Sequence, residues 1–437
     1  MRIANIVHNQ VYSDARVRKV SYSLAKNGYK VTIFGYGSSK KIEDIIESCK
    51  LIIIPKLNLG TINLNSNKYK YKIFLEKIKI LAKLIKILVK PIKYIRKSLN
   101  LFIRKSGGIV IGYNKVANKI FKAIDVNEFD VIHAHDIIGL IVAIRLKNRK
   151  NTLKIIWDAH EVYTELQYKY FIDKFYINFI LKRFSKRIDA FITINNSFVK
   201  YYKKRYPFLP NASIVMNATR KCNLDKKDFK SPLREFSNID ACQKILLFQG
   251  GLQPNRGIDI LLDLADNNLP KDWTILFMGK GDLENEIKEK MKIVNKDRKV
   301  GMEAIKIIPP APYEDLSKWT NGATLGTIFY KGCNYNQKFC TPNKLWEYPN
   351  AEIPILATEL FEISKLVKKY GIGILVPENT TSTKIGKLLN DLKQEKIDDM
   401  VENCRTFNNN ENWYKYEKEL LNVYNSFNKT LNHSNKF

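Results

Sequence analysis

The chain has 437 residues, which exceeds the usual size of a single hydrophobic core, so we expect two domains. A hydrophobic content of 45% supports packed cores and excludes a largely disordered chain, although 27% of the residues are charged. The formal net charge of +31 favours contact with anionic lipid or nucleic acid, and a compositional bias toward Lys, Asn and Ile is the alternative source of part of it.

Patterns for disulfides, zinc and membrane spans are missing from the sequence. The six cysteines are scattered, without a Cys-x-x-Cys pair, and are expected to be reduced thiols. The first residues contain no apolar signal core, and no run approaches the roughly 18 uninterrupted apolar residues of a spanning helix. We therefore expect a cytoplasmic protein.

Short apolar runs alternate with helical patterns through the first half of the chain, as in a doubly wound α/β sheet. A helix is expected over 14–27, because Val17, Tyr22 and Leu24 recur at near-helical spacing and Gly28 is placed to end it. The expected strands are 2–8, 29–37, 50–56, 130–136, 154–161 and 189–195.

A segment rich in Asn, Lys, Pro and Asp, residues 205–240, is predicted to be a linker with a short strand around 213–217. The domain boundaries expected from this pattern are 1–200 and 212–408, followed by an apolar-periodic helix over 410–427. The strands expected in the second domain are 244–251, 273–281, 305–312, 323–330, 353–358 and 371–377.

Residues 68–105 interrupt the alternation with a long basic amphipathic pattern. Apolar residues recur there at steps of three and four, lysines occupy the other face, Glu76 is the only acid and Pro91 predicts a kink. Such a helix can lie in the headgroup layer of an anionic membrane. Packing on its own domain and nucleic-acid contact are the alternatives.

Three of the five histidines follow two neighbouring predicted strands, in VIHAHD (131–136) and WDAHE (157–161). Ligands of open α/β sheets bind outside the carboxyl ends of the strands, so this cluster indicates a site. Structural hydrogen bonding is the alternative for each histidine. Zinc binding is a second alternative, since His133 and His135 share one strand face.

Two later stretches predict a phosphate site. In FQGGLQPNRGIDILLDLA (248–265), Gly250 and Gly251 let the backbone approach a pyrophosphate, and Arg256 can bind it. The turn MGKG (278–281) is similar but weaker, with Lys280 available.

The most specific stretch is FCTPNKLWEYPNAEIPILAT (339–358). Thr341 is expected to cap a helix that starts at Pro342, and its free N–H groups suit phosphate. Lys344 adds a cation, and Glu347, one turn further on, can accept hydrogen bonds from ribose hydroxyls. The sequence has no Asp-x-Asp pair, so a metal-bound pyrophosphate is unsupported.

These stretches, together with YSDARVRK (12–19), resemble glycosyltransferase family 4, the retaining enzymes of GT-B fold, over nearly the whole chain except about residues 55–115. The resemblance implies an α/β fold of two Rossmann-like domains facing a cleft, with a C-terminal helix that crosses back to the first domain. It implies a glycosyltransferase that moves a sugar from a nucleotide-sugar to a lipid-linked or glycan acceptor, with anomeric retention and without metal or cofactor.

The resemblance also implies roles for individual residues. The catalytic group is His135, Asp136 and His160. The donor diphosphate is bound by Gly250, Gly251, Arg256, Asn343 and Lys344, the ribose and base by Gly279, Lys280, Ile308 and Glu347, and the donor sugar by Cys340 and Thr341. The acceptor side is formed by Asp14, Arg16 and Glu161, although Asp14 could instead be a plain helix cap.

One position departs from the family pattern. The helix usually carries a Glu-x7-Glu pair, whose second place is Glu347 here, but Phe339 occupies the first place. The chain in this respect resembles a subgroup with Pro-Asn-Lys-x-x-Glu. The alternatives to a transferase are a GT-B nucleotide-sugar epimerase and a catalytically silent scaffold at the membrane.

The expected partners and location follow from these features. They are a nucleotide-sugar donor, the acceptor, and an anionic membrane surface reached through 68–105, at the inner face of the plasma membrane. Nucleic acid is not expected as a partner, because no RNA-binding signature accompanies the basic segment.

Overall fold

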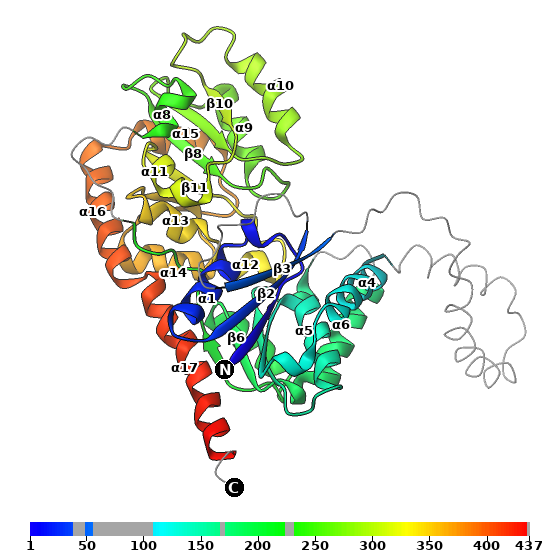
Figure 1. Cartoon of the computed structure of the whole chain (residues 1–437). Helices are drawn as coiled ribbons and strands as arrows, with labels where there is room; N and C mark the ends of the chain where they lie inside the picture. Colours follow the sequence, from blue (N-terminus) through cyan, green and yellow to red (C-terminus); the bar gives the residue numbers. More distant parts are fainter. Residues whose placement is uncertain (38–48, 56–107, 167–170, 223–230, 435–437) are drawn as a thin grey trace, which may run out of the picture.

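The computed structural model of the chain describes residues 1–37, 49–55, 108–166, 171–222 and 231–434. They form two parallel sheets, each with helices packed around it, and we call each sheet with its helices a lobe (Figure 1). Each sheet consists of strands joined by helical crossovers, because a buried parallel strand needs helices on both of its faces. The expected α/β architecture is confirmed.

The first sheet has the strand order β3-β2-β1-β4-β5-β6-β7. Its central strands are mostly apolar, and every residue of β4 is buried, including two histidines. The strands are β1 (Arg2–Ile6), β2 (Lys30–Gly37), β3 (Cys49–Pro55), β4 (Val131–His135), β5 (Lys154–Ala159), β6 (Ala190–Thr193) and β7 (Ala212–Ile214).

The short strand expected inside the linker is β7. It pairs in parallel with β6, with Phe191 opposite Ala212 and Thr193 opposite Ile214. The first sheet therefore continues to residue 214, and the connection to the second sheet begins only after this strand.

The second sheet has the order β10-β9-β8-β11-β12-β13, so its direction of winding reverses between β8 and β11. Ligands of open α/β sheets bind at such a switch point. The strands are β8 (Lys244–Gln249), β9 (Trp273–Met278), β10 (Ile305–Ile308), β11 (Leu325–Ile328), β12 (Ile355–Thr358) and β13 (Gly373–Val376).

The helices fill the connections between these strands. Those of the first lobe are α1 (Ala15–Lys26), α4 (Gly108–Lys122), α5 (Asp136–Lys147), α6 (Phe171–Phe184) and α7 (Asn196–Arg205). Those that follow are α8 (Pro232–Ser237), α9 (Ile258–Asn267), α10 (Glu284–Val294), α11 (Leu316–Thr320), α12 (Tyr335–Lys338), α13 (Lys344–Asn350), α14 (Phe361–Tyr370), α15 (Ser382–Asn390), α16 (Gln394–Asn410) and α17 (Trp413–Ser434).

The last helix, α17, returns to the first lobe (Figure 1). The indole nitrogen of Trp413 donates to Ser23 Oγ on α1 at 2.9 Å, and Tyr424 contacts His133 on β4. Both side chains are fully buried, so the contact is part of the core. The expected C-terminal crossing is confirmed.

The basic segment 68–105, expected to be an amphipathic helix, lies outside the described residues. Within the described part of the chain, no helix combines the length and the hydropathy that a bilayer span requires.

Candidate active site

A buried polar cluster lies at the carboxyl edge of the first sheet, where β1, β4 and β5 end. Asn5, His133, His135 and Asp158 are all inaccessible to solvent. The strand register places them together, because β1 pairs with β4 and β4 with β5. The sequence predicted the two histidines, and it missed Asn5 and Asp158, which look like ordinary strand residues.

Asp158 is held by a two-point ion pair with Arg16. The guanidinium Nε and Nη2 lie 2.7 Å from the two carboxylate oxygens, and Nη1 donates to Val215 O, also at 2.7 Å. Burial opposes ionisation of Asp158, but the charges of Arg16 and His160 and the hydrogen bonds from His133 and His135 together outweigh it, so the pKa of Asp158 is well below the usual range. We correct the expectation that Arg16 faces an acceptor, because its side chain is 4% exposed and already fully engaged.

His135 is also more buried than the sequence suggested. Its Nε2 lies 2.7 Å from Asn5 Oδ1, and its Nδ1 lies 3.4 Å from both His160 Nε2 and Asp158 Oδ2. Since both nitrogens have protein partners, His135 orients His160, and the partly exposed ring of His160 is the one that can reach a ligand.

His160 lies between two carboxylates. Its Nδ1 is 3.3 Å from Asp136 and its Nε2 is 3.2 Å from Asp158. Burial lowers its pKa, but the charges of Asp158 and Asp136 outweigh burial and raise it above the ordinary value. By contrast, burial and the neighbouring His135 lower the pKa of His133 to about 4, so that ring is neutral.

Asp136 begins α5 in a left-handed backbone conformation, with φ 60°. This conformation is unusual for a residue other than glycine and often marks a functional turn. The Asp136 carboxylate accepts a hydrogen bond from the Tyr163 hydroxyl and faces His160, and its side chain is 15% exposed. Asp136 and His160 together form the accessible part of the predicted catalytic group.

Asp14 acts as the N-cap of α1. Its Oδ1 accepts from the backbone N–H groups of Arg16 and Val17, at 3.1 and 3.0 Å, and Asn9 donates to its Oδ2 at 2.8 Å. The alternative of a plain helix cap therefore describes the observed contacts of Asp14, and its assignment to the acceptor side has no contact in its support.

His133, His135 and Asp158 are the one set of described residues whose ligand atoms could surround a metal ion, within 4.8 Å of one another. A metal would fit poorly, because the Arg16 guanidinium already binds both Asp158 oxygens. His133 Nδ1 lies 2.6 Å from the Tyr424 hydroxyl, so this nitrogen is also engaged by the protein. We assign the cluster to hydrogen bonding.

In the second lobe, glycines allow two loops to touch. A Cβ on Gly279 would lie 1.9 Å from the carbonyl oxygen of Gly250, and Gly250 has φ 114°, which only glycine adopts easily. A Cβ on Gly251 would meet Arg256 Nη1 at 3.7 Å, and one on Gly250 would meet Lys344 Cε at 3.5 Å. The two predicted phosphate-binding cations thus flank the predicted glycine loop.

Lys344 is a buried cation without a hydrogen-bonded anion among the described residues. Its Nζ lies 3.7 Å from the centroid of the Phe248 ring. Burial and the Arg256 charge lower its pKa to about 7, although Glu347 opposes the shift. A diphosphate beside Lys344 and Arg256 would supply the missing negative charge.

Glu347 lies one turn after Lys344. Its Oε2 accepts a hydrogen bond from Gln249 Nε2 at 2.8 Å, and Gln249 Oε1 accepts from the Thr320 hydroxyl at the same distance. Burial raises the pKa of Glu347, and Gln249 and Lys344 oppose the rise. The other carboxylate oxygen makes no hydrogen bond with a described residue, so it can accept one from a ligand.

Three of the four residues predicted for the ribose and base side line one hollow of about 280 Å³, and Glu347 is not part of its lining. Gly279 and Lys280 come from the loop after β9, and Ile308 is the last residue of β10. The rest of its lining is formed by Glu284, Lys288, Ile307, Pro309 and Pro310.

The start of α13 differs from the expectation. The helix begins at Lys344 with Asn343 as its N-cap residue, so Thr341 does not cap it. Thr341 Oγ1 is buried and has no hydrogen-bond partner among the described residues. Burial raises the pKa of the adjacent Cys340 thiol to about 12, so Cys340 is neutral.

Phe339 belongs to a segment that docks on the first lobe. Its ring packs against Tyr335, and its carbonyl accepts from Asn195 Nδ2 at 2.8 Å. Asn336 makes two bonds to Val162, one with the N–H at 2.6 Å and one with the carbonyl at 3.0 Å. The place of the family's first Glu is therefore used for contact between the lobes, which the sequence did not signal.

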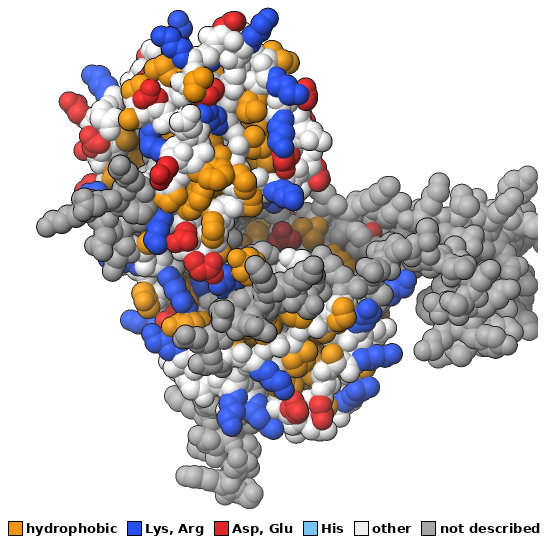
Figure 2. Space-filling view, turned by 45° about the horizontal axis from the view of Figure 1, so that its top comes forward, with side chains coloured by type: hydrophobic (Ala, Val, Ile, Leu, Met, Phe, Trp, Pro, Cys, Tyr) orange, Lys and Arg blue, Asp and Glu red, His pale blue; other side chains and the backbone are white. Residues whose placement is uncertain are grey.

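The two groups of predicted residues face each other where the lobes meet. Glu161, just after β5, has a raised pKa because of burial and the Asp136 charge, and the Arg256 charge opposes this rise across the junction. Arg18 of α1 pairs with Glu314 of the second lobe. In Figure 2, Lys, Arg, Asp and Glu side chains are visible on the surface between the two lobes.

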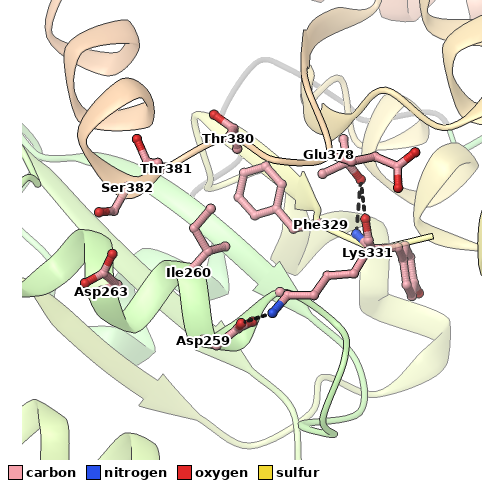
Figure 3. Close-up of a pocket in the computed structure, with 12 residues that line it drawn as sticks. Asp259, Ile260, Asp263, Phe329, Lys331, Glu378, Thr380, Thr381 and Ser382 are labelled. Carbon is pink, nitrogen blue, oxygen red and sulfur yellow. Dashed lines mark hydrogen bonds and ion pairs between the residues drawn. The ribbon is translucent and has the colours of Figure 1, made fainter. Parts of the chain in front are cut away.

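A second hollow, of about 320 Å³, lies in the second lobe between α9 and the loop after β13 (Figure 3). Lys331 forms an ion pair with Asp259 on one side, and Glu378, Thr380 and Ser382 line the other. None of these residues carried a sequence signal.

Residues 15–217 match the model described as Glycosyltransferase Family 4. The match covers most of the first lobe and none of the second sheet. No curated protein matches the chain in sequence. Its fold is shared with solved glycosyltransferase structures of low identity.

Three such structures show the extent of the likeness. Sucrose-phosphate synthase from Thermosynechococcus elongatus is 15% identical with a TM-score of 0.68, covering 98% of this chain and 100% of that chain. HepE from Anabaena, solved in complex with UDP and glucose, is 12% identical with a TM-score of 0.66 and the same coverage. WaaG, a glycosyltransferase involved in lipopolysaccharide biosynthesis, is 12% identical with a TM-score of 0.55, covering 95% and 98%.

Proposed function

We propose that this glycosyltransferase moves a sugar from a nucleotide-diphosphate sugar to a lipid-linked or glycan acceptor of a cell-surface polysaccharide, with anomeric retention. The observation that carries the proposal is that two cations, Lys344 and Arg256, lie beside the Gly250–Gly251 loop. The Asp136–His160 group lies across the junction from them. Of the expected domains 1–200, 212–408 and 410–427, we propose to extend the first through β7 to residue 214 and to begin the second after it, because β7 pairs with β6.

The binding step is explained by charge. The diphosphate lies along the glycine loop, where Lys344 and Arg256 neutralise it, and Glu347 accepts hydrogen bonds from the ribose. Because HepE was solved with UDP, a uridine nucleotide is the first donor to test. The base lies in the hollow lined by Gly279, Lys280 and Ile308.

The chemical step is helped by the same cations. Negative charge develops on the diphosphate as the sugar departs, and fixed cations stabilise it without a metal ion. Protonated His160, held by Asp136, supports the sugar end of the site. Glu161, which follows His160 directly, is the acid proposed to face an acceptor hydroxyl, and the Phe339 segment keeps the lobes together around the donor.

We also propose that the protein acts at the inner face of the plasma membrane. The +31 charge and the basic pattern of 68–105 favour the anionic inner face of the plasma membrane, where lipid-linked acceptors are found. Nucleic acid is not a proposed partner.

The test is an assay of purified protein with UDP-sugars, in the absence and presence of a lipid extract. We expect UDP release that depends on the extract, a labelled lipid product that keeps the donor's anomeric configuration, and loss of both in Arg256→Ala. A changed sugar without any acceptor would identify an epimerase instead. If the folded protein reacts with no nucleotide-sugar, the catalytically silent scaffold at the membrane becomes the better explanation.

A further inference from the structure

Helix α6 exposes two large aromatic side chains on the outside of the first lobe. Phe175 is 60% exposed and Phe179 is 53% exposed, whereas the opposite side of the helix, with Ile177 and Leu181, is buried. Residues four apart lie on one face of a helix, so the two rings are neighbours. Two adjacent exposed phenylalanines cost free energy in water unless another surface covers them.

Cations continue the same face toward the end of α6. Lys182 and Arg183 are exposed and lie seven and eight positions after Phe175, two helical turns further on. Lys186, in the next turn, lies 4.0 Å over the ring of Phe208, which is itself 59% exposed. In the part of the chain that the structure describes, none of these three cations forms an ion pair.

We infer that this α6 patch, formed by Phe175, Phe179, Lys182, Arg183 and Lys186, docks on an anionic lipid bilayer. Exposed aromatics beside Lys and Arg are the combination that inserts into the headgroup layer, with apolar rings entering and cations pairing with lipid phosphates. Each cation near such a surface favours binding by on the order of fivefold.

The position of α6 supports this occupant. It packs against α4 through Asn114 Nδ2 and the Tyr176 hydroxyl, 2.9 Å apart (Figure 1). The helix that follows the basic stretch 68–105 in the sequence is therefore a neighbour of α6. The inference rests on the membrane part of the proposed function, but not on the transferase activity.

The decisive experiment uses the full chain with Phe175→Trp and vesicles containing about a third anionic lipid. We expect the new tryptophan to be accessible to iodide in buffer, and to shift to the blue and be quenched by brominated lipid when vesicles are added. The matched control is Phe236→Trp, which places a tryptophan at a 59% exposed site in the second lobe and should show no lipid quenching.

A charge test complements it. Replacing Lys182, Arg183 and Lys186 with Glu should lower the vesicle partition coefficient at least tenfold. The same replacement at Lys292, Lys296 and Lys299, exposed lysines of the second lobe, should lower it by less than threefold.

Two results would overturn the inference and leave the proposed function standing. One is a tryptophan at 175 already shielded from iodide without vesicles, which would mean that the chain itself or a second copy covers the patch. The other is vesicle binding without quenching at 175, which would assign binding to 68–105 alone. No vesicle binding at all would contradict both membrane proposals, while UDP-sugar turnover would still be measured separately.

Discussion

Arg16 and Asp158 come from α1 and β5, 142 residues apart in sequence, and form a buried two-point ion pair with both N···O distances at 2.7 Å. The same guanidinium holds Val215, just after the last strand of the first sheet. One side chain therefore joins the first helix, the histidine cluster and the connection between the lobes.

Removing one partner leaves an uncompensated buried charge. We predict that Arg16→Ala lowers the free energy of unfolding by about 3–5 kcal/mol in urea denaturation. Arg2→Ala is the control, because the Arg2–Asp130 pair lies at the surface, and it should cause no measurable change. Because the folded pKa of Asp158 is lowered, its contribution persists above the ordinary carboxyl pKa and is lost as pH falls through the lowered value. Equal effects of the two variants would refute this account.

His160 should titrate above the ordinary histidine pKa of 6.5, because Asp158 and Asp136 stabilise its proton. NMR of labelled histidine rings measures this directly, and His160→Gln identifies the signal among five. Asp136→Asn should lower the value, whereas Asp259→Asn in the second lobe should not. The raised pKa contributes stability below pH 6.5, which is lost as pH rises through the folded value. A His160 that titrates below 6.5 would show that burial prevails.

Tyr424 connects the returning helix to the histidine cluster. Tyr424→Phe leaves the buried Nδ1 of His133 without its 2.6 Å partner, so we expect a loss of about 1–3 kcal/mol in the free energy of unfolding. Tyr414→Phe on the same helix is the control, because Tyr414 is 55% exposed. If both variants unfold like the wild type, the hydrogen bond has no stabilising role.

Nucleotide binding should take up protons above pH 7. Lys344 has a pKa of about 7, so it is largely neutral at pH 8, and a diphosphate beside it would restore its proton. Calorimetry of UDP binding at pH 8 in Tris and in HEPES should give two enthalpies. They should differ by the difference between the two buffers' heats of ionisation, multiplied by the number of protons taken up. In a pair of buffers suited to pH 6, this dependence on the buffer should shrink. Lys344→Met should abolish it. Identical enthalpies in both buffers would place the phosphates elsewhere.

Gly279 is required by the contact between two loops. Gly279→Ala would put a methyl carbon 1.9 Å from the Gly250 carbonyl, so we expect lost UDP binding and a lower melting temperature. Gly112→Ala in α4 is the control, because a Cβ there meets nothing within 4 Å, and the better helix propensity of alanine should leave stability equal or higher. Normal UDP binding by Gly279→Ala would remove this loop from the site.

The fold could be predicted from the sequence because its signals are local. Apolar runs such as those of β8 and β9 are buried on both faces, and Gly28, with φ 82°, ends α1 as its type suggests. The strand β7 was harder, since three residues carry little pattern and their pairing with β6 depends on the whole sheet.

The site was predictable only as a set of residue types. Motif spacing brought His135 and His160 together, but it could not show which ring is buried, because that depends on Asn5 and Asp158 from other strands. The burial of Arg16 could not be predicted either, because it depends on Asp158, which is far away in the sequence. Phe339 looked like a departure from a pattern, and only the opposite lobe explains it.

Calorimetric binding of UDP, GDP, ADP and CMP to the purified full chain shows whether Arg256, Lys344 and Glu347 form a nucleotide site. We expect tight binding of one nucleoside diphosphate, lost in both Arg256→Ala and Glu347→Ala. Binding should be kept in Lys331→Ala, because the ion pair of Lys331 lines the other hollow. No binding of any nucleotide to the folded wild type, or binding unchanged in both site variants, would contradict it.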